Sequence, residues 1–328
     1  MAVFTTQQAG DNMNRGFTLG DFGKMFGSVV STKGGFDLAG NSSSTPPVPP
    51  VGSAWAAGPS LNTPRSFHVG CGTVTAGLCT GGRTAGGTVK TTEEGDGTSW
   101  VFGGDMNNTS ETGGGAGTQS AGLKMCGRAS SASAPNAITE TYNGTTWSVS
   151  GDTSIARTFV GGCGVQTAAL CAGGFNGFAG GIQISTEGFN GVSWSFLQDL
   201  NVARSYMAVF GTRSAAAACA GYKSTAPSTW YDTTEFYDGV AWSVGPVLST
   251  VKRGPGGCGA PTAALVYGGS PSNGVYIKTT EACDGVTWTS KSDMNTARMV
   301  PGSGGTWSSG LVTCGENAAI LGTTEVFS

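Results

Sequence analysis

The sequence has few charged residues for its length. Of its 328 residues, 17 are Lys or Arg and 20 are Asp or Glu, so 11% are charged and the net charge is -3. A globular protein usually has about 25% charged residues. Because the chain also lacks a basic run, it does not carry the electrostatic footprint of a nucleic-acid-binding protein. We therefore expect no nucleic-acid partner.

Long apolar runs are missing as well. No stretch approaches the roughly 18 consecutive apolar residues of a membrane-spanning helix. The start, MAVFTTQQAGDN, lacks the basic and apolar regions of a secretory signal. The sequence thus predicts no membrane insertion and folding in a reducing cytoplasm. In that compartment the nine Cys are expected to be thiols rather than disulfides.

Residue types that serve metals and catalysis are scarce. His68 is the single histidine, and no Cys-x-x-Cys or clustered Cys/His spacing occurs. Zinc sites need such spacings. No pair of nucleophile and base can be argued, and no phosphate-binding loop leads from a strand into a helix. The sequence therefore predicts no metal site, no cofactor and no catalytic residue.

Glycine is abundant, with 57 residues, and it belongs to a repeat of about 46 residues. Six Trp recur at intervals of 45 to 48 residues, and a Gly follows each by 17 residues. A Glu in a Thr-Glu pair precedes each of the last five Trp by seven residues, and another Thr-Glu pair lies near the C-terminus. We assign a structural role to the repeated residues, which are Trp55, Trp100, Trp147, Trp194, Trp242 and Trp288 with Glu93, Glu140, Glu187, Glu235, Glu281 and Glu325.

Each repeat predicts four short strands. An Asn-Gly or Asp-Gly pair such as Asp96-Gly97 precedes most of the Trp and predicts a two-residue type I′ hairpin. Four-stranded repeats of this length are typical of a β-propeller. Residues 53–328 make six repeats if the strand around Trp55 completes the last one, which otherwise lacks a Trp. The sequence predicts an all-β, six-bladed β-propeller closed by an N-terminal strand.

A basic residue also recurs. An Asn-x-x-Arg turn such as Asn201 to Arg204 follows most of the Trp by about ten residues; the fifth repeat has Lys252 and the second has Ser110 in the basic position. We predict that this residue and the Thr-Glu carboxylate form a partly buried, hydrogen-bonded pair. The alternative is a catalytic cluster of arginines over the axis, as in sialidases.

The cysteines follow the repeat too. We assign one repeat position, occupied by Val266 in the fifth repeat, to Cys79, Cys126, Cys171, Cys219 and Cys314. Substitution by Val indicates small, buried, apolar packing. Cys71, Cys163 and Cys258 occur in the odd repeats alone, which predicts a two-blade unit used three times.

The repeats resemble kelch repeats, in the version found in structural proteins of bacteriophages, particularly marine ones. The resemblance covers residues 53–328 and rests on Gly-Gly doublets and on phrases such as TETYNGTTW and GTQSAGL. The doublets are Gly81-Gly82, Gly173-Gly174 and Gly268-Gly269, while the even repeats depart from them. The resemblance implies a virion structural protein. A kelch-type copper oxidase is excluded, because it needs more than one His.

The first 52 residues lack the repeat. Residues 1–40 scatter five apolar anchors among Gly, Thr and Asp, and residues 41–52 form a Ser- and Pro-rich tether, which is semi-rigid. We interpret residues 1–40 as an arm that docks on other virion proteins through Phe4, Phe17, Phe22, Phe26 and Phe36. The alternative is an arm folded back on its own propeller.

Variation in repeat length predicts a recognition face. The distances from Glu to Trp and from Trp to Gly are constant, so all variation falls between Gly and the next Glu, in the loop from the second to the third strand. Variable loops on a rigid scaffold commonly bind partners. The candidate residues are Phe175, Asn176, Phe178, Tyr222, Trp230, Tyr231 and Tyr276. The alternative is neutral loop drift with the aromatic rings tucked onto the blade.

These observations rank three functions. The first is a non-enzymatic phage structural protein, located in the virion, with its arm anchored to capsid, neck or tail proteins and its propeller displayed for decoration or host attachment. The second is a module that binds a host-surface glycan or receptor, as in a tail fibre or tip. The third is a propeller glycoside hydrolase, disfavoured because its catalytic residues are missing. The sequence leaves open whether the chain forms a homo-oligomer.

Overall fold

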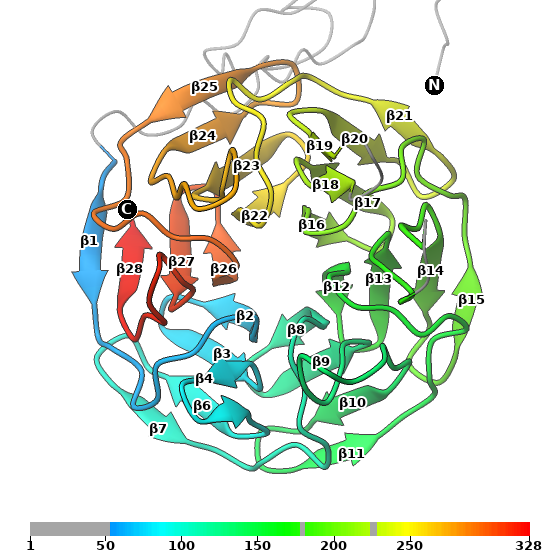
Figure 1. The fold of residues 1–328 in the computed structure, drawn as a ribbon, viewed down its shortest axis with the longest axis vertical. Helices are drawn as coiled ribbons and strands as arrows, with labels where there is room; N and C mark the ends of the chain where they lie inside the picture. The colour runs from blue at the N-terminus through cyan, green and yellow to red at the C-terminus, as the bar shows by residue number, and fades with distance from the viewer. Residues whose placement is uncertain (1–52, 178–180, 224–227) are drawn as a thin grey trace, which may run out of the picture. The chain divides into compact units, whose positions relative to one another are not determined.

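The computed structural model describes residues 53–177, 181–223 and 228–328. The predicted arm and tether and Phe178 lie outside these ranges. Within them the chain forms strands and turns without a helix, and six four-stranded antiparallel sheets surround a central axis (Figure 1). The predicted all-β, six-bladed β-propeller is therefore confirmed.

The two inner strands of each blade are rich in Gly and Ala. The strands nearest the axis are β2 (Val69–Thr73), β8 (Gly114–Thr118), β12 (Gly161–Val165), β16 (Ala208–Thr212), β22 (Gly256–Ala260) and β26 (Gly302–Thr306). Next come β3 (Ala76–Thr80), β9 (Ala121–Met125), β13 (Ala168–Ala172), β17 (Ala215–Cys219), β23 (Ala263–Tyr267) and β27 (Ser309–Thr313). Small residues are needed here because a Cβ at Gly70 would lie 2.7 Å from the backbone nitrogen of Ser303 in the neighbouring blade.

The two outer strands carry the Thr-Glu pair and the Trp. The third strands are β6 (Thr92–Gly95), β10 (Thr139–Tyr142), β14 (Thr186–Phe189), β20 (Thr234–Tyr237), β24 (Thr280–Cys283) and β28 (Thr324–Phe327). The outermost are β7 (Trp100–Phe102), β11 (Trp147–Val149), β15 (Trp194–Phe196), β21 (Trp242–Val244), β25 (Trp288–Lys291) and β1 (Trp55–Gly58). Two small hairpins, β4 (Arg83–Thr84) with β5 (Gly87–Thr88) and β18 (Tyr222–Lys223) with β19 (Thr229–Trp230), extend the loops of blades one and four.

The ring closes as the repeat predicts. Strand β1 pairs antiparallel with β28, with Trp55 opposite Phe327 and Gly58 opposite Thr324. The blue start and the red end of the described chain thus share one blade (Figure 1). Because β28 is covered by a strand from the other end of the chain, the last blade has the same four strands as the others, and its third strand is not an exposed edge.

The repeated Gly that follows each Trp lies where the two inner strands meet. At Gly72, φ is +89° and a Cβ would lie 2.2 Å from the carbonyl oxygen of Ala76. The same contact measures 2.1–2.3 Å at Gly117, Gly164, Gly211, Gly259 and Gly305. Both the backbone conformation and the close approach exclude a side chain.

The hairpin between the third and fourth strands differs from the type I′ prediction. A type I′ turn needs a positive φ at both residues of the Asp-Gly or Asn-Gly pair. Only the Gly has one, with φ between 88° and 95° at Gly97, Gly144, Gly191, Gly239 and Gly285. The Asp96 carboxylate instead accepts hydrogen bonds from the backbone N–H groups of Thr98 and Ser99, both at 2.7 Å. The acidic or amide side chain therefore fixes the turn, and the type I′ prediction was wrong.

The repeated Trp join neighbouring blades. The ring nitrogen of Trp147 donates to Thr92 Oγ1 in the preceding blade at 2.9 Å. Equivalent bonds of 2.9–3.1 Å run from Trp55, Trp194, Trp242 and Trp288 to Thr280, Thr139, Thr186 and Thr234. At the closure, Trp100 donates to the carbonyl oxygen of Pro59, which also accepts from Thr324. The core accordingly lies between the sheets, for example where Leu123 of blade two packs with Phe189 of blade three.

The strand pairing corrects the assignment of five Cys to one position. Cys79, Cys171 and Val266 do share the place opposite the repeated Glu. Cys219 lies one residue later, opposite Thr234. Cys126 and Cys314 lie one residue further still, at positive φ, where odd blades have the first Gly of the doublet. The chain from the turn to each Cys differs in length, and only the pairing register separates the three positions. All nine Cys are buried and free.

Candidate functional site

Two sets of repeated positions have to be separated before a site can be assigned. The first set is the basic residue and the Thr-Glu carboxylate, which we call the staples. Five blades contain one, with N–O distances of 2.6–2.9 Å and side-chain exposures of at most 3%: Arg65–Glu93, Arg157–Glu187, Arg204–Glu235, Lys252–Glu281 and Arg298–Glu325. The expected ion pairs are therefore present and buried.

The Arg204 staple shows how these charged groups are satisfied within one blade. Arg204 Nη2 donates to Glu235 at 2.8 Å, while Nη1 donates to the carbonyl oxygens of Ala220 and Thr233 at 3.0 and 2.9 Å. The carboxylate also accepts three hydrogen bonds from Asn201 and Val202 at 2.7–3.2 Å. Each arginine staple ties the turn that begins a blade to the end of the second strand and to the third strand, whereas Lys252 bonds to Glu281 of the third strand. This geometry is structural, and it does not gather arginines over the axis.

Blade two lacks the basic residue at Ser110 and supplies a buried charge from another strand. Lys124 of β9 lies opposite Glu140 in the β9–β10 pairing and is 1% exposed. Burial lowers the pKa of Lys124 to about 8. Asn107 and Asn108 together donate four hydrogen bonds to the Glu140 carboxylate at 2.7–3.1 Å. The carboxylate of the Thr-Glu pair therefore has partners in every blade: a staple in five blades, and the hydrogen bonds from Asn107 and Asn108 in blade two.

The second set lies at the mouth of the propeller on the face of the variable loops. In each blade the residue that follows the Gly-Gly doublet, or the equivalent pair in the even blades, forms a two-way β-bridge. Its partner lies three residues before the first residue of the inner strand, and the N–O distances are 2.8–3.0 Å. These six bridged pairs, which we call the rim, are Arg83–Ser66, Arg128–Glu111, Phe175–Thr158, Tyr222–Ser205, Ser270–Arg253 and Glu316–Met299. The backbone contact is the same in every blade, whereas the side chains change from cation to ring to anion.

Inside the rim, six further residues encircle the axis in the left-handed conformation. They are Phe67, Thr112, Phe159, Tyr206, Gly254 and Val300, with φ from 47° to 64°. Backbone hydrogen bonds of 2.7–3.1 Å connect five successive pairs around this axial ring, and the six residues line a cavity of about 110 Å³. Positive φ costs a bulky residue of the order of 1–3 kcal/mol, and such residues concentrate at functional sites. Blade five shows that Gly also fits there.

Three aromatic residues of the axial ring, Phe67, Phe159 and Tyr206, pack together, and we call them the floor. The guanidinium groups of arginines in the rim lie against these rings. Phe159 and Tyr206 stack with centroids 3.8 Å apart, and Phe67 lies 6.0 Å from Phe159. The guanidinium carbon of Arg83 lies 4.7 Å from the Phe67 centroid and that of Arg128 lies 5.3 Å from Phe159. These are cation–π distances. Arg253 completes the arrangement 5.6 Å from Tyr206. Aromatic rings can stack on a sugar, and guanidinium groups can bind an anion. This combination therefore suits an anionic or sugar-like partner.

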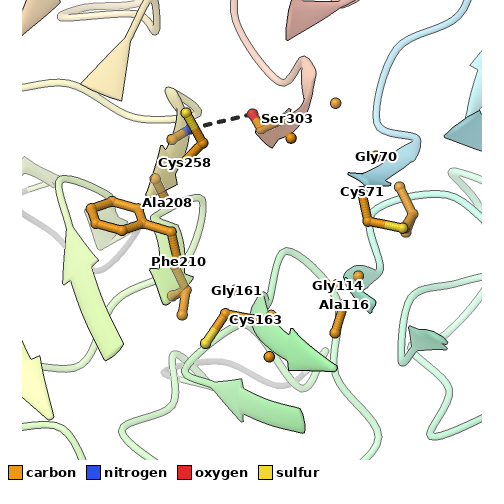
Figure 2. A pocket seen from close by; sticks show the side chains of 18 of the residues that line it. Gly70, Cys71, Gly114, Ala116, Gly161, Cys163, Ala208, Phe210, Cys258 and Ser303 are labelled. Atoms are coloured by element: carbon orange, nitrogen blue, oxygen red, sulfur yellow. Dashed lines mark hydrogen bonds between the residues drawn. The ribbon is translucent and has the colours of Figure 1, made fainter. Parts of the chain in front are cut away.

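Beyond the floor, the inner strands line a channel of about 240 Å³ (Figure 2). Cys71, Cys163 and Cys258 alternate around it with Ala116 and Phe210. Gly304 of β26 also lines the channel. Each thiol donates to a backbone carbonyl oxygen of the next blade, at Thr118, Thr212 and Thr306. Burial raises the pKa of all three thiols to about 12. Their alternation therefore serves blade contacts, because a thiol with such a pKa is a poor nucleophile.

The single histidine also has a structural environment. His68 Nε2 accepts a hydrogen bond from the backbone N–H of Gly302 at 3.0 Å and lies 2.8 Å from Thr313 Oγ1. Both partners belong to blade six, so His68 joins the first blade to the last. Burial, with the nearby charges of Arg65 and Arg298, lowers the pKa of His68 to about 3. The imidazole is therefore neutral at physiological pH.

The structure divides the predicted recognition residues into groups. Phe175 and Asn176 line a cavity of about 300 Å³ together with Arg128. Tyr222 and Trp230 pack against each other, with centroids 5.1 Å apart. Tyr231 covers the Arg204 guanidinium at 5.2 Å and so belongs with a staple. Tyr276 lies in the loop between β23 and β24, and in the described part of the chain it lines none of these cavities. Phe178 lies outside the described residues.

Loop-length reasoning missed the floor and Arg253. Phe67, Phe159, Tyr206 and Arg253 precede the inner strands and belong to segments of constant length. A signal was nevertheless present, because an aromatic residue occupies the equivalent place in blades one, three and four within SFHVG, TFVGG and SYMAV. A position that varies in chemistry inside an otherwise regular repeat would have identified it.

Comparison with protein-family models and with curated proteins finds no match for this chain. Among the described residues, no helix is long and apolar enough to cross a membrane. The same residues contain no group of three His, Cys, Asp or Glu side chains arranged to hold a metal ion. The contacts of the rim and of the axial ring are therefore the observations that bear on function.

Proposed function

We propose that the chain is a non-enzymatic structural protein of a bacteriophage virion, whose propeller binds a host-surface ligand or partner through the rim. One observation carries the binding role: six bridges with the same backbone geometry present six different sets of side chains. Structural positions vary much less, because the Trp recurs in all six blades and the basic residue of the staples in five. Positions whose backbone is fixed and whose side chains diverge are expected to make specific contacts.

The contacts of the rim favour binding over hydrolysis. Its two carboxylates are already engaged, Glu111 with Arg128 Nε at 2.9 Å and Glu316 with Arg83 Nη2 at 3.3 Å. Glycoside hydrolysis ordinarily requires two carboxyl groups that flank the scissile bond, one of them able to deliver a proton. Carboxylates held in ion pairs with arginine are poorly suited to that role. Tyr, Trp and Arg are instead the residues enriched where proteins bind partners.

The virion part of the proposal rests on the sequence. The phrases over residues 53–328 resemble the kelch repeats of phage structural proteins, and the Phe-containing residues 1–40 would anchor the chain to capsid, neck or tail proteins. Host attachment through the rim would then place the propeller at the particle surface.

Mass spectrometry of gradient-purified particles tests this assignment. Particles produced from the phage DNA that encodes the chain should contain its peptides, including peptides from residues 1–40, in constant ratio to the major capsid protein. A chain found only in the host lysate fraction, and absent from infectious particles, would contradict the proposal. Mild dissociation of the particles should release the chain together with the protein that its arm contacts.

A further inference from the structure

Three arginines lie on aromatic rings in and around the rim, and two of them have a carboxylate partner. Arg83 pairs with Glu316 and Arg128 pairs with Glu111. Arg253 forms no ion pair within residues 53–177, 181–223 and 228–328. Arg83 and Arg128 each contact an aromatic ring and a carboxylate. Arg253 contacts aromatic rings but has no carboxylate partner in the described residues.

The surroundings of Arg253 are the most aromatic of the three. Its guanidinium carbon lies 5.6 Å from the ring centroid of Tyr206, 5.1 Å from Tyr222 and 5.9 Å from Trp230. Its backbone is fixed by the two-way bridge to Ser270. Because the backbone is pinned and three rings surround the side chain, the guanidinium is held in place before a ligand arrives. Preorganisation of this kind reduces the entropy lost on binding.

Two hydrogen-bond donors in this cluster lack an acceptor. Arg253 Nε and Trp230 Nε1 are both buried, and neither has a hydrogen-bond partner among the described residues. Arg157 and Arg213 also have an open Nε, so what distinguishes the Arg253 cluster is the second open donor beside it. Buried polar groups are nearly always paired, and an unmet donor destabilises the free protein. The Tyr222 hydroxyl, by contrast, is engaged with Ser228 Oγ at 3.1 Å. The cluster therefore holds two donors without an acceptor among the described residues, beside the partly exposed rings of Tyr222 and Trp230.

We propose that Arg253, Tyr222 and Trp230 form a subsite for the carboxylate of an acidic saccharide, of the uronic or sialic acid class. The guanidinium fork binds the carboxylate through two parallel hydrogen bonds. The rings of Tyr222 and Trp230, both partly exposed, offer flat apolar faces to the sugar ring. The two carboxylate pairs already present in the rim favour this anion over a phosphate or sulfate. The inference rests on the proposed binding role of the rim and names the chemistry of its ligand.

Calorimetric titration of the full-length chain tests the subsite. The probes are alginate oligosaccharides, which are polyuronates, and neutral dextran oligosaccharides of the same length, at constant ionic strength. We expect the wild type to bind alginate and not dextran. Arg253→Gln should weaken alginate binding by about tenfold or more, and Arg253→Lys should restore only part of it, because Lys keeps the charge and loses the fork. A sulfated dextran should bind more weakly than alginate.

Arg213→Gln is the matched control. It removes the same charge from the turn between β16 and β17, on the opposite face of blade four, and should leave alginate affinity unchanged. Urea unfolding of each variant verifies that it is folded. Absence of alginate binding, equal affinity of wild type and Arg253→Gln, or an equal loss in Arg213→Gln would overturn the subsite. Host-cell binding that survives Arg253→Gln and is lost in other rim variants would overturn the subsite and leave the proposed function standing.

Discussion

The staples and the rim use the same residue type for opposite purposes, as Arg204 and Arg253 show. Arg204 is fully buried, and its terminal nitrogens donate to two carbonyl oxygens and a carboxylate of its own blade. Arg253 is partly exposed, lies among three rings and has an Nε without an acceptor. Arg204, whose terminal nitrogens are satisfied within its own blade, stabilises the fold. Arg253, which is partly exposed among three rings and has no carboxylate partner in the described residues, is available to a ligand.

The largest effect should follow from breaking a staple. Arg204→Ala leaves the Glu235 carboxylate buried without its cation, which is expected to cost about 3–5 kcal/mol of unfolding free energy. Urea unfolding monitored by Trp fluorescence measures it. Arg253→Ala is the matched variant in the rim and should cost no more than about 1 kcal/mol, the usual contribution of a cation–π contact near the surface. Similar losses in the two variants would abolish the distinction between staples and rim.

A smaller, pH-dependent effect should come from His68. Its pKa is about 3 in the folded protein and about 6.5 in the unfolded chain. Between these values the unfolded chain binds more protons, so the free energy of unfolding falls as the pH drops below 6.5. The loss between pH 7 and pH 5 should be about 2 kcal/mol. His68→Gln keeps an acceptor near Gly302 and should lose that much less over the same interval. A variant with the wild-type pH dependence would show that His68 is accessible and protonated when folded.

The smallest expected effect concerns the axial ring. Comparing variants at Val300 tests whether the positive φ of this residue lowers the free energy of unfolding. Val300 is a β-branched residue with φ of +47°, where blade five has Gly254 with φ of +62°. Val300→Gly relieves this strain, whereas Val300→Ala removes the same contacts and keeps it. We expect the glycine variant to be more stable than the alanine variant by about 1 kcal/mol. Thermal unfolding of the two variants provides the comparison, and a more stable alanine variant would refute the strain.

The sequence predicts the scaffold well because its structural requirements repeat. A Trp, a Gly 17 residues later and a Thr-Glu pair recur in each blade because each blade has the same hydrogen bonds to satisfy. Closure of the ring is predictable because the last repeat has a Thr-Glu pair without a following Trp, whereas Trp55 has no Thr-Glu pair before it. Lys124 of blade two escaped notice, because this buried cation lies on another strand and comes opposite Glu140 only through the β9–β10 register.

The candidate site was only partly predictable, for a physical reason. Loop length identified Phe175, Asn176, Tyr222 and Trp230, which lie on the loops between the second and third strands. The floor of Phe67, Phe159 and Tyr206 depends on a positive φ in front of each inner strand, which sequence propensity argues against for aromatic residues. The three rings of the floor come from different blades, and neighbouring rings are about 50 to 90 positions apart in the sequence. They meet only when the blades assemble around the axis.

Under the proposed virion role, binding of the labelled full-length protein to the bacterial cells that this phage would infect tests the division between scaffold and rim most directly. The rim variant combines Arg83→Gln, Phe175→Ser and Tyr222→Ser. Its control replaces Val192, Val240 and Val286, which are exposed in the hairpins of the opposite face, with Ser. We predict that the rim variant remains folded and loses cell binding, while the control binds as the wild type does. A rim variant that is folded and binds normally would contradict the account.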